Sequence, residues 1–201
     1  MTIRTRNLIA SVALCVVLVV ALSGCTLFSE DLATENDTNG LFHLRYPESW
    51  QSFVQPGLIA LYAADELPDG EDAAFDTLSV GVYTATEAAT VPVDDRLTSL
   101  LELRAEDREW KDQAFTAPRE VTVGKRPAWA VDVTGTDAKD REFAGRAVLV
   151  RTNGSEVLLF AVSPAADWEG HSDDVDALLD EWYWHRQERE TSATAEPTAT
   201  P

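Results

Sequence analysis

The sequence predicts an α+β domain in which a largely antiparallel β-sheet is flanked by two helices. Apolar residues alternate with polar ones along most of the stretch 40–187, as they do in strands with one buried face. Two segments, one near residue 100 and one near residue 175, have helical spacing instead. Strands that come in runs, with helices between and after them, are typical of an antiparallel sheet covered by helices.

Seven segments have the alternating pattern or the continuous apolar run that strands show. The first ends at Pro47, which cannot donate to a sheet ladder. The last is apolar at every position of Val157–Val162, which predicts a central strand covered on both faces. The expected strands are 42–46, 58–63, 78–82, 121–123, 129–133, 143–150 and 156–162.

Two turn signals lie between the later strands. Asn153-Gly154 separates the last two apolar runs, and Asn-Gly in this position is the strongest short-range indication of a hairpin. The segment Gly124–Pro127 separates the strands on either side of it and has the composition of a turn. Both signals favour antiparallel pairing of neighbouring strands.

The first helix is indicated by apolar residues at helical spacing: Val93, Leu97, Leu100, Leu101 and Ala105. Its first turn contains Asp94 and Asp95, where acidic side chains complement the helix dipole.

Ser172 is the expected N-cap of the second helix. The acidic residues expected in its first turn are Asp173, Asp174 and Asp176. Its expected apolar stripe is Val175, Leu178, Leu179 and Trp182. We expect the aromatic segment Trp182–His185 to form its final turn, with His185 at the helix end.

Residues 1–24 have the order of parts found in a secretory signal peptide. Arg4 and Arg6 form a basic start, and the apolar run 8–21 is shorter than the ~20 residues of a membrane-spanning helix. Leu22-Ser23-Gly24-Cys25 follows and resembles the lipobox of bacterial lipoproteins. The resemblance implies that the signal is removed and that Cys25, diacylated on sulfur, becomes the first residue.

Cysteine usage agrees with lipidation of Cys25. The only other cysteine, Cys15, lies in the segment that would be removed, so Cys25 has no partner for an internal disulfide. We therefore expect a protein that is lipid-anchored to the cell membrane on its extracytoplasmic face. Two rival interpretations stay open, a chance Leu-Ser-Gly-Cys after an ordinary signal peptide and an uncleaved N-terminal anchor.

The chain is predicted to have one domain between two polar segments. Residues 25–39 are interpreted as an acidic flexible tether that begins with the lipidated Cys25. The segment 40–187 is the α+β domain, and the Thr-, Ala- and Pro-rich tail 188–201 is expected to be disordered.

The chain is strongly acidic. It has 35 Asp and Glu against 16 Lys and Arg, which gives a net charge of −19. Removing residues 1–24 would take away two arginines and no acid. Such a surface repels nucleic acid, so no nucleic-acid partner is expected, while a protein partner in the cell envelope remains open.

The expected domain opens on Leu41–Trp50, which contains an aromatic residue, an aliphatic residue and Tyr-Pro-x-x-Trp, and Val123–Trp129 carries the turn Gly-Lys-Arg-Pro-Ala. These segments resemble the opening pattern and the Gly-x-Pro-Ala turn of PsbP-like domains, which are common in exported bacterial lipoproteins. The hairpin that reaches Phe160 and the closing helix near 175–184 extend the likeness. The resemblance implies an antiparallel sheet flanked by helices.

The resemblance implies less about function, because the best-known members are non-enzymatic accessory proteins of a membrane complex and other members are lipoproteins of unknown role. It supplies no catalytic residues. The matching positions are expected to be structural framework: Tyr46, Pro47, Trp50, Gly124, Pro127 and Ala128.

One loop is dense in carboxylates and is a candidate cation site. Its acids, within 65–72, are Asp65, Glu66, Asp69, Glu71 and Asp72. Hard cations such as calcium take six to eight oxygen ligands, but the spacing of an EF-hand is absent, and a solvated acidic loop explains the same residues. The three histidines have no zinc spacing, so no transition-metal site and no cofactor are expected.

Trp168 and Trp184 are candidates for a partner surface, because exposed aromatic side chains mark binding sites. Packing into the core is the alternative. No Gly-x-Ser-x-Gly elbow and no phosphate-binding loop occurs, so no catalytic residue is assigned. The expected function is a non-enzymatic binding or accessory module, with a divalent-cation or small-ligand binder and a cryptic hydrolase as alternatives.

Overall fold

The computed structural model describes residues 31–67, 75–152 and 154–185. Residues 1–24 and Cys25, the tail 188–201 and Asn153 lie outside the described residues. The described residues form eleven strands and two helices. In chain order these are β1 (Leu32–Asn36), β2 (Phe42–Pro47), β3 (Gln51–Gln55), β4 (Leu58–Tyr62), β5 (Ser79–Ala85), α2 (Val93–Asp107), β6 (Lys111–Phe115), β7 (Arg119–Val123), β8 (Arg126–Thr136), β9 (Glu142–Arg151), β10 (Glu156–Pro164), α3 (Trp168–Asp180) and β11 (Trp182–Trp184).

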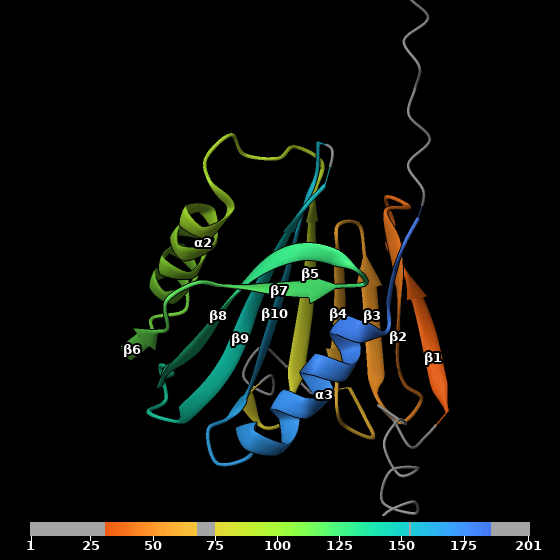
Figure 1. Ribbon diagram of the computed structural model, residues 1–201. Coiled ribbons are helices and arrows are strands. Elements are labelled where there is room, and N and C mark those ends of the chain that lie inside the picture. The colour runs from red at the N-terminus through yellow and green to blue at the C-terminus, as the bar shows by residue number, and fades with distance from the viewer. Residues whose placement is uncertain (1–30, 68–74, 153, 186–201) are drawn as a thin grey trace, which may run out of the picture.

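The strands form two antiparallel sheets (Figure 1). The larger sheet has the order β3-β4-β5-β10-β9-β8-β6, and β7 also pairs with β8. The smaller sheet has the order β1-β2-β11. The predicted α+β class, an antiparallel sheet with two helices, is confirmed. Neither helix in the described part of the chain is long and apolar enough to cross a membrane.

The larger sheet has a hydrophobic core on each face. One core includes α3, the smaller sheet and the β10 residues Val157, Leu159 and Ala161. The other includes α2 and the β10 residues Phe160 and Val162. Alternate side chains of β10 therefore enter opposite cores, which confirms the prediction of a central strand buried on both faces.

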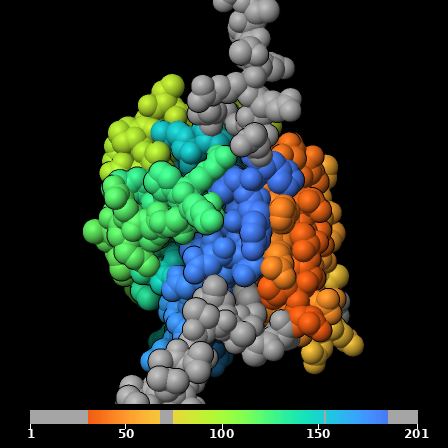
Figure 2. All heavy atoms as spheres, turned by 45° about the vertical axis from the view of Figure 1, so that its right-hand side comes forward, coloured from red at the N-terminus to blue at the C-terminus, as the bar shows by residue number. Residues whose placement is uncertain are grey.

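The two helices lie on opposite faces of the larger sheet. α3 packs on β10, β7 and β9 and also contacts β2 of the smaller sheet. Figure 2 shows this side, where the blue C-terminal elements lie between the green strands and the orange N-terminal strands. α2 packs on β8 and β9, toward one end of the other face. The α2 side of β4 and β5 is therefore less covered.

The predicted turn at Gly124 and the predicted hairpin at residue 154 are both present. Val123 pairs with Arg126, so Gly124 and Lys125 form a two-residue connection. Their φ angles are 50° and 70°, as a type I′ turn requires. β9 and β10 pair antiparallel on either side of Gly154, whose φ is 89°.

The predicted tether 25–39 is wrong from residue 32 onward, because Leu32–Asn36 forms β1 and pairs with β2. Two of its acids, Glu35 and Asp37, form hydrogen bonds within the protein. Glu35 Oε1 accepts hydrogen bonds from the Tyr46 and Ser52 hydroxyls at 3.3 and 2.8 Å. Asp37 is buried, and its carboxylate accepts from the amides of Asn39 and Leu41. Paired acids stabilise a polar strand that has little apolar surface.

The C-terminal helix differs from its prediction at both ends. α3 begins at Trp168 rather than after Ser172, and the Ser172 hydroxyl donates to the Glu169 carbonyl inside the helix. The helix ends at Asp180, so the aromatic segment Trp182–Trp184 is strand β11, paired with β2. Trp182 is buried while Tyr183 is exposed, which is the alternation of a strand.

Strands β3 and β6 were missed by the sequence analysis. Both lie at the ends of the larger sheet's strand order. Edge strands have a free side in contact with solvent and carry polar residues, so Gln51–Gln55 and Lys111–Phe115 lack the apolar pattern that identifies interior strands.

Candidate functional site: an aromatic pocket with two arginines

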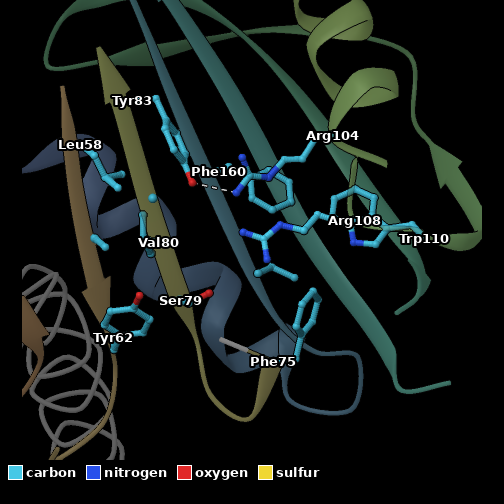
Figure 3. Close-up of a pocket in the computed structure, with 13 residues that line it drawn as sticks. Leu58, Tyr62, Phe75, Ser79, Val80, Tyr83, Arg104, Arg108, Trp110 and Phe160 are labelled. Atoms are coloured by element: carbon cyan, nitrogen blue, oxygen red, sulfur yellow. Dashed lines mark hydrogen bonds between the residues drawn. The ribbon is translucent and has the colours of Figure 1, made fainter. Parts of the chain in front are cut away.

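A pocket of about 190 Å³ opens on the α2 side of the larger sheet (Figure 3). Its floor is made by neighbouring residues of β4, β5 and β10. Ala60 pairs with Gly81, and Gly81 pairs in turn with Phe160. Alanine and glycine carry almost no side chain, so the surface of β4 and β5 is not filled at Ala60 and Gly81, and a hollow forms there. The opposite side of the same strands holds large buried residues such as Leu61 and Val80.

Tyr83 closes one side of the hollow. A Cβ placed on Gly81 would lie 2.8 Å from the Tyr83 ring and 2.9 Å from its hydroxyl, so the ring lies back over Gly81. A glycine inside a strand often marks such a close approach. The Tyr83 hydroxyl accepts a hydrogen bond of 2.8 Å from Nη2 of Arg104, which reaches across from α2.

Arg104 lies above the aromatic floor. Its guanidinium carbon is 4.7 Å from the centroid of the Phe160 ring and 4.9 Å from that of Tyr83, both within cation–π range. Arg108 follows one helical turn later and also lines the pocket. Figure 3 shows the Arg104 side chain crossing over Phe160 toward Tyr83, while Arg108 reaches toward the space above Phe75.

Trp110 forms the wall below α2. Its ring centroid lies 5.6 Å from that of Phe160 and 4.7 Å from that of Phe143. The backbone turns sharply on both sides of it, since Glu109 and Asp112 have φ angles of 53° and 49°. Left-handed backbone at two non-glycine residues is costly and indicates that packing holds Trp110 in this place.

Two N–H donors of the pocket-lining residues have no partner. Nε of Arg104 and Nε1 of Trp110 are both buried, and neither makes a hydrogen bond within the described chain. An unpaired buried donor costs ~1–3 kcal/mol relative to one with an acceptor. A ligand whose acceptor oxygen reached either N–H would recover part of that energy.

The charge of the pocket is opposite to that of the whole chain. Among the described residues, those that line it include two arginines and no aspartate or glutamate, although the net charge of the chain is −19. No carboxylate of the described residues forms an ion pair with Arg104. The positive potential at Arg104 is therefore available to a bound anion.

The acidic loop predicted as a cation site is only partly described. Asp65 and Glu66 are exposed, and the backbone carbonyl of Asp65 accepts a hydrogen bond from Gln51. Asp69, Glu71 and Asp72 lie outside the described residues. Among residues 31–67, 75–152 and 154–185, no three histidine, cysteine or acidic side chains are grouped as metal ligands would be.

Trp168 and Trp184 are half-buried and pack against the core on the α3 side, so each still exposes part of its ring and the partner surface stays a prediction. Trp184 Nε1 donates a 2.8 Å hydrogen bond to the Val123 carbonyl, and the Arg126 guanidinium lies 4.6 Å from the Trp184 ring centroid. The structure thus separates these two residues from the pocket, which lies on the opposite face of the sheet.

The sequence analysis did not identify the pocket. Two local signals were present: Gly81 inside an apolar strand, and arginines four residues apart at the end of a predicted helix. Neither signal shows that residues 81, 104 and 160 meet, because that depends on how the helix crosses the sheet. The site is a product of tertiary packing.

Comparison with known proteins identifies the fold. No protein-family model matches the sequence, and no curated protein matches it. The structure is similar to cyanobacterial PsbP from Synechocystis, with a TM-score of 0.58, 10% identity, and coverage of 82% of this chain and 99% of that one. It is also similar to the Ran-binding protein Mog1p of Saccharomyces cerevisiae, with a TM-score of 0.54, 9% identity, and coverage of 77% and 96%.

A third similar structure is a protein of unknown function from Pseudomonas aeruginosa, described as a putative regulator, with a TM-score of 0.50 and 13% identity over 78% of this chain and 99% of that one. At such identities the likeness concerns the fold alone. It confirms the resemblance that the Tyr46-Pro47 opening and the Gly124 turn had suggested. The chain therefore has a PsbP-like fold, an antiparallel sheet flanked by two helices.

Proposed function

We propose that the protein is a lipid-anchored, non-enzymatic binding module on the extracytoplasmic face of the cell membrane. The observation that carries the binding role is the lining of the pocket: aromatic surface, two arginines and unpaired N–H donors. Pockets that bind small molecules combine an apolar wall with a few polar groups in this way. The lipobox ending at Cys25 supports the anchoring role.

The same lining favours binding over turnover. General acid–base catalysis uses a group whose pKa lies near the working pH, most often histidine or a carboxylic acid. In the part of the chain that the structure describes, the pocket lining contains no histidine, aspartate, glutamate, lysine or cysteine, and arginine stays charged throughout the physiological range. Its side chains are therefore suited to holding a molecule in place.

The anchor would hold the domain close to the bilayer. The first strand begins at Leu32, seven residues after Cys25, so the connecting chain can extend at most about 25 Å. A ligand bound in the pocket would remain within reach of a membrane protein or complex. This distance is compatible with an accessory role beside a partner in the cell envelope.

The anchoring part is tested by fractionating cells that produce the intact chain, the Cys25→Ala variant or the Cys15→Ala variant. We expect the intact chain and Cys15→Ala to be in the membrane fraction with an acylated N-terminal peptide by mass spectrometry. Cys25→Ala should lack the acyl group. Equal acylation of the two variants, or none in the intact chain, would contradict the anchoring.

The non-enzymatic part is tested with a molecule that binds the purified lipoprotein. The molecule is recovered after prolonged incubation with the protein and its mass is measured. We expect its mass to be unchanged. A ligand that is converted by the wild-type protein and left intact by a pocket variant such as Arg104→Met would show that the site is catalytic.

A further inference from the structure

We infer that the pocket between α2 and the β4-β5-β10 floor binds a small aromatic carboxylate, with the carboxylate at Arg104 and the ring among Phe160, Trp110 and Phe75. The inference rests on the proposed binding function and specifies its ligand class. Nothing in the sequence motifs assigns a ligand to these residues.

Arg104 supplies the recognition of the carboxylate. Its guanidinium is planar and presents its donors as a fork that matches the two oxygens of a carboxylate. One donor, Nη2, is used by the Tyr83 hydroxyl at 2.8 Å, and this bond fixes the orientation of the group. Nε has no acceptor. An arginine held in place with an unused donor is prepared for an anion.

Trp110 is the second, independent indication of a ligand. The residue is only 7% exposed, lines the pocket and has no acceptor for its indole N–H. Buried tryptophan N–H groups usually have a hydrogen-bond partner. A carboxylate oxygen of the ligand can become that partner after a small rotation of the indole ring.

The size and lining of the pocket favour a ligand with one aromatic ring. A volume of about 190 Å³ exceeds the roughly 150 Å³ cavity that holds a benzene ring, which leaves room for one ring and a carboxylate. Phe75, Trp110 and Phe160 offer ring edges and faces for offset or edge-to-face packing. A larger ligand such as a nucleotide would extend out of the pocket opening.

The charge of the protein restricts the ligand to low negative charge. A net charge of −19 repels anions at long range, and the repulsion grows with ligand charge. Among anions, a monocarboxylate with an apolar ring is repelled least by this charge, and it is attracted by both the arginine and the aromatic walls. A phosphate dianion is repelled more strongly by the net charge and, having no ring, gains nothing from the aromatic walls.

The experiment uses the full acylated chain in nanodiscs of zwitterionic phosphatidylcholine. Benzoate, benzamide and acetate are titrated while the indole N–H resonances are followed by ¹H–¹⁵N NMR, with Trp110→Phe to assign the Trp110 signal. Benzamide has the shape of benzoate without the charge, and acetate has the charge without the ring. Empty nanodiscs give the blank.

The variants are Arg104→Met, which removes the charge and keeps a long side chain, and Arg104→Lys, which keeps the charge and loses the fork. Lys125→Asn is the matched control. It removes one exposed positive charge at a turn on the other side of the molecule, at a positive φ that asparagine tolerates. Thermal melts establish that each variant is folded.

We expect benzoate to shift the Trp110 signal and to bind about ten- to a hundredfold more tightly than benzamide or acetate. Arg104→Met should lose that advantage, Arg104→Lys should recover part of it, and Lys125→Asn should retain it. If benzoate and benzamide bind equally in wild type and Arg104→Met, the carboxylate assignment is overturned while the binding module stands. If none of the three binds folded wild-type protein, the ligand class is wrong, whereas the membrane anchoring is decided separately by Cys25→Ala.

Discussion

Nδ1 of His43 lies 3.0 Å from Nε2 of His185, and the two imidazole rings join β2 to the residue that follows β11. Nδ1 of His185 lies 3.1 Å from the Gly40 carbonyl oxygen, which can only accept, so Nδ1 carries the proton. In neutral His185 the other nitrogen, Nε2, is then the acceptor. His43 must therefore donate from Nδ1.

Replacing His43 by phenylalanine tests this chain of hydrogen bonds. Phenylalanine keeps a flat ring beside Tyr183, whose ring is stacked on His43 with centroids 5.0 Å apart, but it removes the donor. We expect a loss of about 1 kcal/mol in the free energy of unfolding, the usual size for one hydrogen bond, measured by urea denaturation. Long-range ¹H–¹⁵N spectra of wild type should show Nδ1–H tautomers for both rings in their neutral forms.

His171→Ala is the matched control, because His171 lies on α3, where its ring has only a long, 3.5 Å contact with Asp174. We expect a change of less than about 0.5 kcal/mol there. A His43→Phe variant as stable as His171→Ala would show that the imidazole pair adds nothing to stability.

The β7–β8 turn gives a second prediction, at Gly124. The residue has a φ of 50°, and a Cβ there would collide with the Trp182 carbonyl group, 2.9 Å from its carbon atom. Both the backbone conformation and the close approach exclude a side chain. We expect Gly124→Ala to destabilise the protein by about 2 kcal/mol or more, as measured by chemical denaturation.

Gly170→Ala should act in the opposite direction. Gly170 lies in α3 with no atom within 4 Å of an added Cβ and without a positive φ. Alanine favours the helix over glycine by up to about 1 kcal/mol, so this variant should be slightly more stable than wild type. If both glycine variants lost stability equally, the contact between the turn and Trp182 would not be the cause.

The strands that the sequence predicted are those whose stability depends on an apolar face. Val157–Val162 could be recognised as a central strand because both of its faces are buried, and Gly124-Lys125 because the turn needs positive φ at both residues. Strand β1 could not be recognised, since Glu35 is held by hydroxyl groups of Tyr46 and Ser52 from other strands. Polar strands stabilised by non-local hydrogen bonds carry no periodic signal.

The aromatic segment Trp182–Trp184 was misjudged for a related reason. Its side chains continue the apolar pattern of α3, so helical spacing alone extends the helix to residue 185. In the structure the Glu181 carbonyl accepts from the Arg45 amide, and the chain leaves the helix to pair with β2. Pairing with a strand 140 residues earlier outweighs the local preference.

The lowered pKa of Asp137 predicts how the stability of the protein changes at acid pH. Burial by itself raises the pKa of Asp137, but hydrogen bonds from the Arg141 amide and guanidinium and from the Lys139 amide outweigh it, so the pKa lies below its ordinary value of 3.8. A group with a lowered pKa in the folded state stabilises the protein above its unfolded-state pKa. That contribution is lost as the pH falls below 3.8 through the folded-state pKa.

The test compares wild type with Asp137→Asn by denaturation at a series of pH values. Near pH 7 we expect wild type to be more stable by ~1 kcal/mol, because asparagine accepts the backbone hydrogen bonds but lacks the charge that pairs with Arg141. The difference should shrink below pH 3.8. A difference that stays constant from neutral to strongly acid pH would assign the effect to packing.

Gly81→Ala tests whether the hollow over β5 is the binding site. The added methyl group would lie 2.8 Å from the Tyr83 ring, which is the movable end of a side chain, so the ring must shift while the backbone stays in place. That shift carries the Tyr83 hydroxyl away from Arg104 and reduces the space in the pocket. We expect stability to change by less than about 1 kcal/mol and benzoate binding to weaken about tenfold.

Tyr83→Phe separates the two effects of that shift. It removes the hydroxyl that orients Arg104 but keeps the ring and fills no part of the pocket, so it should weaken benzoate binding less than Gly81→Ala does. The comparison is made by the same Trp110 indole titration. If Gly81→Ala binds benzoate as tightly as wild type, the ligand does not occupy the space between Gly81 and Arg104. Gly81 lies in β5 and Arg104 in α2, so retained binding would also mean that benzoate binds somewhere other than between this helix and this part of the sheet.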